Sequence, residues 1–546
     1  MYPACFKKMT TPTLEQRKIL KETNSCVVVA RPGSGKTFTL SYKIREILSM
    51  LPDHKGVIAI SFTNKASTEL RDRVSNLDSQ KKSSFFGTID KFCLIEIIIP
   101  FLRHKYGLPK VEDIKIIKAS DSQLFKQLCP EGLKKISWNI IKKIYKSGEV
   151  ILELSGLIAI NLLKENKILR EYMKARYSHI IIDEYQDSGK EQHQIFMELF
   201  NLGLIAIAVG DLDQSIYAFA GKSSIYLYEL TQRKDFKKYP LTENHRCHPS
   251  IAAYSLKLIN KDFELTKDIK EKRVYSKIVQ GYHPQIAQWI EKAVHSLSKS
   301  VKFSDIKLGE IAILCRSNIS AKMIKENITK FEVQLREDTP LDNLGSPWAL
   351  FFSECLYCLL DPKLNMNEIF EKYLDGNSAK GYKSNLSKLI KLKQETNEKN
   401  ITNLKKSFDL LKSSAELLIP NAEKVDSIRA LLEVLDSEIF IQSYFPHKDT
   451  HIQMMTLHKS KGLEFSVVFH LDLYQWTIPS YPALQGDSDE MIQSINLHYV
   501  GITRAKKACI LVSSTQKIDL KTNTIKNATI SEFLTRDDLS QLRKEL

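Results

Sequence analysis

Residues 26–40, CVVVARPGSGKTFTL, constrain the fold of this chain more than any other stretch of it. An apolar, β-branched run from Cys26 to Ala30 breaks at Pro32-Gly33-Ser34-Gly35, and a segment with helical spacing follows. This order predicts a buried strand, a tight glycine loop and a helix. The N–H groups of such a loop, backed by the positive end of the helix dipole, converge on phosphate oxygens. The sequence therefore predicts a phosphate-binding loop.

Two side chains at the start of the expected helix suit a nucleoside triphosphate. Lys36 can reach the β- and γ-phosphates, and the Thr37 hydroxyl can ligate Mg²⁺. Ala30 stands where the general pattern of such loops has its first glycine. We therefore expect ATP and Mg²⁺ as cofactors. The residues of this segment expected to bind the nucleotide are Ala30, Arg31, Pro32, Gly33, Ser34, Gly35, Lys36, Thr37 and Phe38.

A second buried strand, HIII (179–182), ends in the paired carboxylates Asp183 and Glu184. Ligands of doubly wound sheets bind at the carboxyl ends of parallel strands. We expect Asp183 to hold Mg²⁺ and Glu184 to accept the proton of an attacking water. A third strand, from Leu204 to Val209, leads to Gln214, a candidate sensor of the γ-phosphate. Either segment alone could be an ordinary strand end, but their combination with the glycine loop favours one catalytic site.

Composition and length agree with a soluble protein of several lobes. Hydrophobic residues make up 43% of the 546 residues and charged residues 26%, and no apolar run approaches the ~18 residues that a membrane span needs. Most of the nine cysteines lie in apolar runs, which favours a reducing, cytoplasmic compartment. Cys355 and Cys358 form a CxxC inside an apolar helical pattern, so we expect core packing and no metal there.

The net charge of +16 and a pI near 9.1 suit a partner that carries many phosphates. A solvated basic surface would explain the charge alone equally well. The order of motifs along the chain favours the first interpretation.

The chain resembles the UvrD/Rep group of superfamily 1 DNA helicases in segments that run in order from residue 11 to residue 512. These segments are TPTLEQRKIL (11–20), IAISFTNKASTELRDRV (58–74), FFGTIDKFC (85–93), IIIDEYQD (180–187), VGDLDQSIYAFAG (209–221), LTENHRCHPSI (241–251), IAILCRSN (311–318), MMTLHKSKGLEFSVVF (454–469) and LHYVGITRAKKACILV (497–512). Because nearly the whole chain is covered, the resemblance is specific.

The resemblance implies an α/β fold with two RecA-like lobes, 1A and 2A, that sandwich ATP and move along single-stranded DNA, in the 3′→5′ direction. We expect lobe 1A at residues 1–94 and 176–245 and lobe 2A at residues 246–339 and 446–546. Short helical insertions, 1B at 95–175 and a reduced 2B at 340–445, would interrupt them. Within 2B, the lysine-rich segment 380–406 has Leu386, Leu389, Ile390 and Leu392 at helical spacing, which predicts an amphipathic basic helix that faces nucleic acid, a partner or solvent.

The resemblance also assigns roles to residues outside the glycine loop. Arg246 and Arg504 would neutralise charge on the γ-phosphoryl group, a role worth ~10³–10⁵ in rate. Gln16 would read adenine, His245 would lie at the purine, and Glu464 would hold the ribose hydroxyls. The expected DNA contacts are Phe62, Thr63, Asn64, Thr88, Tyr217, Phe219 and His458, since aromatic rings stack on bases and polar groups follow phosphates.

Three positions depart from the pattern of this family. Phe38 stands where relatives often have arginine, and His245 stands where a tyrosine usually stacks on adenine, so nucleotide preference is open. Ala220 stands where an arginine commonly links DNA to the ATP site, which puts the strength of that coupling in doubt.

Within the family, the compact form is similar to the helicase subunit of the Gabija antiphage system, and the likeness lies in residues 85–107 and 180–200. This implies a DNA-stimulated ATPase that responds to single strands or DNA ends and works with a separate OLD-family (TOPRIM) nuclease, because the chain ends soon after its last motif. A stand-alone repair or replication helicase is the alternative. An ATPase-inactive DNA-binding scaffold is disfavoured by Lys36, Asp183, Glu184, Arg246 and Arg504 together.

Overall fold

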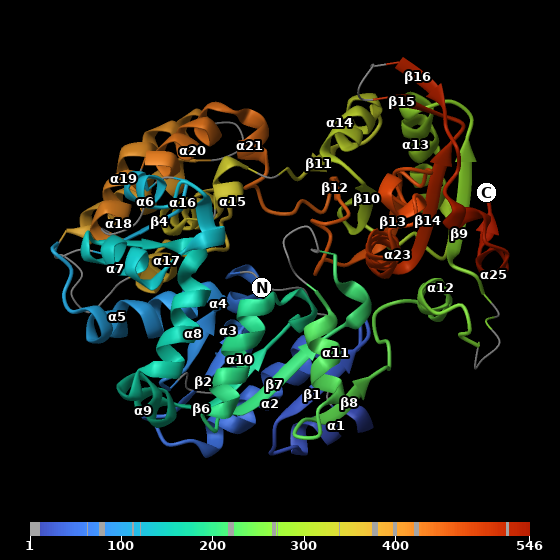
Figure 1. Ribbon diagram of the computed structural model, residues 1–546. Helices are drawn as coiled ribbons and strands as arrows, with labels where there is room; N and C mark the ends of the chain where they lie inside the picture. Colours follow the sequence, from blue (N-terminus) through green and yellow to red (C-terminus); the bar gives the residue numbers. More distant parts are fainter. Residues whose placement is uncertain are drawn as a thin grey trace. The chain divides into compact units, whose positions relative to one another are not determined.

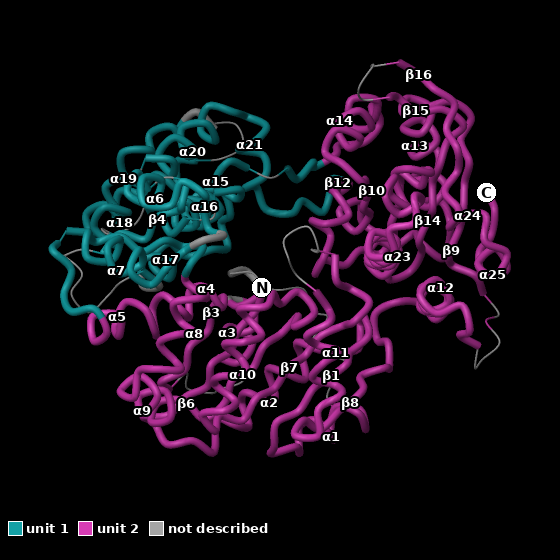
Figure 2. Tube along the Cα trace, in the orientation of Figure 1, with its two compact units in different colours: residues 1–3, 106–154, 334–451 teal, residues 4–105, 155–333, 452–546 magenta. Residues whose placement is uncertain are grey.

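The computed structural model of the protein describes residues 11–62, 64–75, 82–111, 114–120, 122–216, 223–264, 269, 271–337, 339–344, 346–373, 381–396, 401–419, 425–519 and 524–546. These residues form two compact units, drawn in different colours in Figure 2. Residues 106–154 and 334–451 form a helical unit, and residues from 4–105, 155–333 and 452–546 form a two-sheet unit. Each unit thus combines segments that are far apart in the sequence.

The first sheet of the two-sheet unit is entirely parallel. Its strands, in spatial order, are β3 (Phe85–Gly87), β2 (Gly56–Ile60), β6 (Tyr177–Ile182), β7 (Ile205–Gly210), β1 (Cys26–Ala30) and β8 (Lys237–Leu241). Val29 of β1 lies opposite Gly210 of β7, and Ala208 lies opposite Ile182 of β6. The three strands expected to deliver catalytic residues are therefore neighbours whose carboxyl ends lie at one edge.

Helices flank this sheet, as Figure 1 shows for α10 and α11. They are α1 (Leu14–Lys21), α2 (Lys36–Met50), α3 (Asn64–Ser75), α4 (Ile89–Phe92), α5 (Ile99–Tyr106), α8 (Ser155–Glu165), α9 (Lys167–Arg176), α10 (Lys190–Asn201) and α11 (Ile225–Gln232), with a π-helical stretch at Cys93–Ile98. Apolar side chains of β1, β2 and α2, such as Val28, Val57 and Ile44, form one core cluster. Within residues 95–175, α8 and α9 group with this sheet, whereas residues 106–154 belong to the helical unit.

The second sheet has the order β11 (Val333–Leu335), β12 (Ile452–Thr456), β10 (Ile311–Cys315), β13 (Phe465–His470), β14 (Ala505–Ser514), β9 (Val274–Val279) and β17 (Lys544–Glu545). In this spatial order, every neighbouring pair of strands from β12 to β17 is parallel. The accompanying elements are α12 (Pro249–Ile259), α13 (His283–Lys299), α14 (Asn318–Asn327), α22 (Tyr481–Leu484), α23 (Ser488–Thr503), α24 (Glu532–Thr535), α25 (Asp537–Ser540) and the antiparallel hairpin β15 (Gln516–Asp519) and β16 (Thr524–Asn527). Two parallel sheets flanked by helices confirm the predicted α/β fold.

The helical unit has its own apolar core. It contains α6 (Gln123–Leu128), α7 (Trp138–Lys146), α15 (Pro340–Leu344), α16 (Pro347–Leu360), α17 (Met366–Tyr373), α18 (Tyr382–Glu395), α19 (Ser407–Leu418), α20 (Val425–Asp436), α21 (Glu438–Gln442) and the parallel strands β4 (Lys115–Ile117) and β5 (Glu149–Ile151). Cys355 and Cys358 are fully buried in α16, which confirms that they pack in the core. Helix α18 confirms the amphipathic helix, although it ends at Glu395, and Leu389 and Leu392 are its buried residues.

The two units differ in charge. Residues 106–154 and 334–451 contain equal numbers of Lys plus Arg and Asp plus Glu. The formal excess of +16 therefore lies entirely outside the helical unit. Any nucleic-acid contact driven by net charge is expected on the two-sheet unit.

We predict that Trp348→Ala destabilises the helical unit by about 3–5 kcal/mol, because removing a fully buried indole leaves a cavity. Trp348 is 0% exposed, and its Nε1 donates to the Ile419 carbonyl at 2.8 Å. Urea unfolding followed by circular dichroism measures the effect. Trp138→Ala is the control, because Trp138 is 38% exposed in the same unit, and an equal loss in both variants would contradict the prediction.

Candidate active site

The glycine loop between β1 and α2 depends on two residues in the left-handed backbone region. Gly33 has φ +72° and Gly35 has φ +81°, conformations that only glycine adopts at little cost. The Ser34 hydroxyl donates to the Arg31 carbonyl at 2.7 Å, and the Arg31 N–H donates to the Leu241 carbonyl at 2.9 Å. Ala30 ends β1 and is buried, as is Pro32. The loop is thus fixed from within and against β8, and α2 begins at Lys36 with Thr37 second.

Three further residues expected to bind the nucleotide, Gln16, His245 and Phe38, lie around this loop or in the first turn of α2. The buried Gln16 side chain accepts from the Thr13 N–H at 3.0 Å as part of the capping box of α1, and its Nε2 donates to the Ser34 carbonyl at 3.2 Å. The His245 N–H donates to the Gly33 carbonyl at 2.9 Å. Phe38 lies in the first turn of α2, and its ring centroid is 4.5 Å from that of Tyr42. The sequence drew no attention to Tyr42.

Lys36 and Glu184 form a half-buried ion pair, with Nζ 3.0 Å from Oε1. Burial alone would lower the pKa of Lys36, but Glu184, Asp211 and Asp183 raise it above its usual value. Burial alone would raise the pKa of Glu184, but the charges of Lys36 and Lys461 lower it. Glu184 is therefore a carboxylate under physiological conditions, as a proton acceptor must be.

Asp183 follows β6 directly, and its Oδ1 accepts from the Glu184 N–H at 2.9 Å. Burial, and then the neighbouring Glu184 carboxylate, raise its pKa. No cluster of three or more metal-binding side chains occurs among the described residues. A site with one carboxylate and one hydroxyl still fits Mg²⁺, because this ion usually takes one or two protein ligands together with phosphate oxygens. Asp183 and Thr37 would supply those protein ligands.

The end of β7 joins the same site through Asp211 and Gln214. The Gln214 Nε2 donates to Asp211 Oδ2 at 2.7 Å, and the Asp211 N–H donates to Gln186 Oε1 at 3.0 Å. From the second sheet, Lys461 Nζ lies 2.5 Å from Asp187 Oδ2 and donates to the Gln214 carbonyl at 2.8 Å. Burial raises the pKa of Asp187 to about 6, against the opposing effect of Lys461. Lys461 thus ties the loop after β12 to the carboxylate edge of the first sheet.

Arg504, at the end of α23, is 2% exposed and contacts only neutral acceptors. Its guanidinium donates to the carbonyls of Val500 and Leu463 at 3.0 and 3.3 Å, to Thr503 Oγ1 at 3.2 Å and to Gln214 Oε1 at 3.4 Å. Among the described residues, no carboxylate lies within ion-pair distance of it. Burial, and then the nearby Arg246 guanidinium, lower its pKa to about 10. A buried cation without a carboxylate partner fits an anionic ligand.

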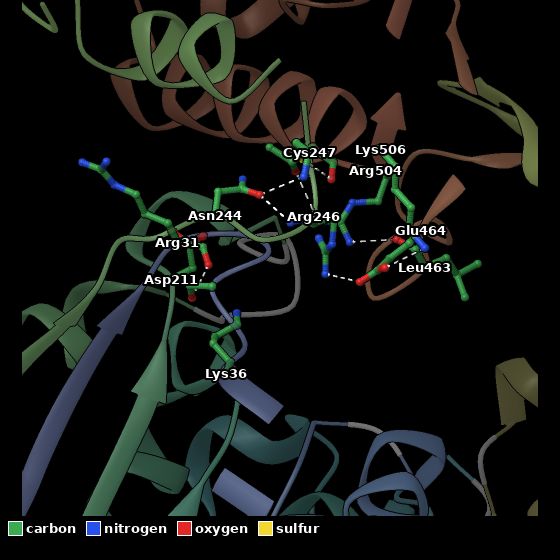
Figure 3. A network of polar contacts seen from close by, with 12 residues as sticks. Arg31, Lys36, Asp211, Asn244, Arg246, Cys247, Leu463, Glu464, Arg504 and Lys506 are labelled. Atoms are coloured by element: carbon green, nitrogen blue, oxygen red, sulfur yellow. Dashed lines mark hydrogen bonds and ion pairs between the residues drawn. The ribbon is translucent and has the colours of Figure 1, made fainter. Parts of the chain in front are cut away.

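Arg246 is a second arginine near Arg504 (Figure 3). Its guanidinium lies 2.6 Å from Glu464 Oε1, while Lys506 lies 3.1 Å from Glu464 Oε2. The backbone N–H groups of Arg246 and Cys247 both donate to Asn244 Oδ1 at 2.8 Å, which fixes this turn. The Arg246 Nε is buried without a hydrogen-bond acceptor among the described residues, as is Lys36 Nζ beyond its ion pair. Both orphaned donors fit a phosphate-bearing ligand.

The residues expected at DNA are described only in part. Thr63, Tyr217 and Phe219, together with Ala220, lie outside the described residues, and Asn64 is the first residue of α3. Phe62 follows β2 and is half-buried. Thr88 caps α4, where its Oγ1 accepts from the Lys91 N–H at 3.4 Å. His458 is half-buried in the loop after β12, and its carbonyl accepts from the Lys461 N–H at 3.3 Å.

Sequence reasoning missed several residues of the site. Asp187 is the last acid of IIIDEYQD, and Lys461 is the second lysine of HKSKGLEF, so both lay within segments already singled out. Their pairing carried no signal, because a contact between residues 274 positions apart has no local pattern. Lys506, which pairs with Glu464, was missed for the same reason, whereas Asn244 was missed although its contacts with Arg246 and Cys247 are local.

This arrangement defines an NTPase with a phosphate-binding loop, in which Arg504 after α23 reaches Gln214 at the end of β7. Family models agree with it: the UvrD/REP helicase N-terminal domain matches residues 13–154 and 149–237, and the UvrD-like helicase C-terminal domain matches residues 353–516. The chain belongs to the UvrD/Rep helicase family and is an ATP-dependent DNA helicase by class.

Relatives match over most of the chain. It is 28% identical over 507 residues to the Gabija protein GajB of Bacillus cereus, covering 92% of this chain and 96% of that protein. It is 23% identical over 621 residues to the ATP-dependent DNA helicase Rep of Buchnera aphidicola, with coverages of 88% and 90%. It is 23% identical over 628 residues to the ATP-dependent DNA helicase PcrA of Bacillus subtilis, with coverages of 91% and 82%.

Among the described residues, no helix is both long and apolar enough to span a membrane.

We predict that Gly33→Ala lowers kcat/KM for ATP by about tenfold to a hundredfold, because displacing catalytic groups by about 1 Å has effects of this size. A Cβ at Gly33 would lie 2.6 Å from Arg246 Cβ and 2.7 Å from Asn244 Oδ1. Steady-state ATP hydrolysis measures the loss.

Gly132→Ala is a matched control for backbone strain. Gly132 also has φ +72°, but a Cβ there meets nothing within 4 Å. Its ATP hydrolysis is expected to equal that of the wild type. An equal loss in both variants would mean that left-handed strain, and not the contact with Arg246, causes the effect.

Proposed function

We propose that the protein uses ATP with Mg²⁺ to move 3′→5′ along single-stranded DNA, and that it acts in the cytoplasm with a separate OLD-family (TOPRIM) nuclease in bacterial antiphage defence. The ATP-driven part rests on the buried Arg504, which donates to Gln214 and has no carboxylate partner among the described residues. A buried guanidinium whose acceptors are all neutral lacks a counter-charge, and an anion that reached it would supply one.

The residues divide the work of phosphoryl transfer. Lys36 and the loop N–H groups would bind the phosphates, and Arg246 and Arg504 would neutralise the charge that develops on the γ-phosphoryl group. Glu184 would take the proton of the attacking water. Mg²⁺, held by Thr37 and Asp183, would supply neutralisation of the β- and γ-phosphate oxygens. Gln214 is hydrogen-bonded to both Asp211 and Arg504. It would therefore connect Arg504, and the γ-phosphoryl charge that Arg504 neutralises, to the first sheet.

Two ion pairs would exchange partners when ATP binds. Glu184 holds Lys36, and Glu464 holds Arg246, so the triphosphate would compete with both carboxylates. Release of Glu464 would free it to accept a hydrogen bond from the ribose. Because Glu464 and Lys461 belong to the same loop as His458, nucleotide binding would also shift a candidate DNA contact. Such a loop would couple hydrolysis to movement along the strand.

We propose lobe 1A at residues 1–94 and 176–245, lobe 2A at residues 246–339 and 446–546, and insertions 1B and 2B at 95–175 and 340–445.

The defence role is supported by the length of the alignments. The match to the Gabija protein spans 507 residues, whereas those to Rep and PcrA span 621 and 628, more than the 546 residues of this chain. The chain thus has the compact proportions of the former. A stand-alone repair or replication helicase is the second candidate, favoured by the names of the other two relatives.

We predict that single-stranded DNA stimulates ATP hydrolysis and that Lys36→Ala abolishes hydrolysis while sparing the fold. Glu184→Gln should still bind ATP but turn it over about 10²–10⁴-fold more slowly, because the water-activating base is lost. Steady-state hydrolysis and binding of a fluorescent ATP analogue measure the two effects.

Glu165→Gln is the control, because Glu165 is an exposed carboxylate on α8 and should leave the rate unchanged. Wild-type turnover in Lys36→Ala would refute the phosphate-loop assignment, and lost ATP binding in Glu184→Gln would give Glu184 another role. A stable hetero-complex with a nuclease after affinity purification supports the defence role, whereas a monomer that unwinds 3′-tailed duplexes unaided favours the stand-alone helicase.

A further inference from the structure

Trp476 is an exposed residue of the two-sheet unit, and its backbone has a conformation that a bulky side chain disfavours. Trp476 has φ +64°, and its side chain is 51% exposed. A bulky residue in this region is an outlier, because its Cβ crowds the backbone. Such strain persists only where the surroundings determine the conformation, and it concentrates at functional sites.

Hydrogen bonds on both sides of Trp476 fix its conformation. The Gln475 N–H donates to the Thr529 carbonyl at 2.9 Å, and the Thr477 N–H donates to the Tyr474 carbonyl at 3.1 Å. The Tyr474 hydroxyl lies 2.6 Å from Ser514 Oγ at the end of β14. The segment is therefore anchored to the sheet, and the indole projects from a rigid base.

A cation accompanies the indole. Lys517 Nζ on β15 lies 5.9 Å from the Trp476 ring centroid and 5.6 Å from that of Tyr474. An aromatic face beside an ammonium group can stack on a base while the cation contacts its phosphate.

We propose that Trp476 and Lys517 form a base-stacking contact for single-stranded nucleic acid, separate from the residues that the motifs assign to the DNA track. Charge favours this occupant over a protein, because the whole formal excess of +16 belongs to the unit that carries Trp476. Stacking on an indole is tolerant of sequence, as movement along a strand requires. The inference rests on the proposed action on single-stranded DNA.

The decisive variant is Trp476→Gly, because glycine adopts φ +64° without strain. The full chain should remain at least as stable in thermal unfolding, while its dissociation constant for fluorescein-labelled oligo(dT) rises roughly tenfold. Trp476→Phe, which keeps an aromatic face, should retain most of the affinity. Trp138→Ala removes an exposed tryptophan of the helical unit and should change nothing.

Salt dependence separates the two side chains. Lys517→Gln should lower the slope of log Kd against log salt by about one, whereas Trp476→Gly should leave that slope unchanged. An unchanged oligo(dT) affinity in Trp476→Gly would overturn the inference and leave the proposed function intact, and a protein-docking role would predict that result. A wild-type chain that fails to bind oligo(dT) would overturn both.

Discussion

The ion pair between Lys36 and Glu184 is the contact around which the rest of the site is arranged. Two opposite charges can be withdrawn from water together only if each compensates the loss of water around the other. Their meeting requires that β1 and β6 end at one edge, with β7 between them, and the parallel sheet provides that geometry. The positive φ of Gly35 starts α2 at Lys36, and the positive φ of Glu184 turns that side chain back toward it. Sheet order and two backbone conformations therefore decide where the charges lie.

Contacts between the two sheets extend this pair into a network. Lys461 is held by Asp187 and by the Gln214 carbonyl, and Arg504 reaches the Gln214 side chain. Gln214 thus contacts both Lys461 and Arg504 while its side chain is hydrogen-bonded to Asp211 at the end of β7. The two arginines differ in what holds them. Arg246 has a carboxylate partner that it can exchange, whereas Arg504 has only neutral acceptors and keeps its charge available for an anion.

The sequence was sufficient for the strands, the glycine loop and the paired acids, because each depends on a local pattern. β1 has the predicted bounds, and β6 and β7 differ from prediction by one or two residues. The sequence was insufficient to predict contacts such as Lys461 with Asp187 or Arg246 with Glu464. These side chains are hundreds of positions apart, and such a contact produces no local sequence pattern. Nor did the sequence indicate that residues 106–154 group with residues 334–451, since both are merely helical and lysine-rich in sequence. The strain at Trp476 was likewise invisible, because no local rule places tryptophan at positive φ.

The separation of charge between the two units follows from the same division of the chain. Lysines of the helical unit are balanced by its own acids, as Lys405 is by Asp436, so the unit has no net field to attract phosphates. Basic segments such as α18 are therefore better explained as solvated faces of a neutral unit than as part of a nucleic-acid track. In the two-sheet unit the excess is not cancelled, and it coincides with the arginines and lysines that converge on the carboxylate edge. The nucleotide site and Trp476 lie in this same unit, so binding of DNA and hydrolysis of ATP can act on one framework.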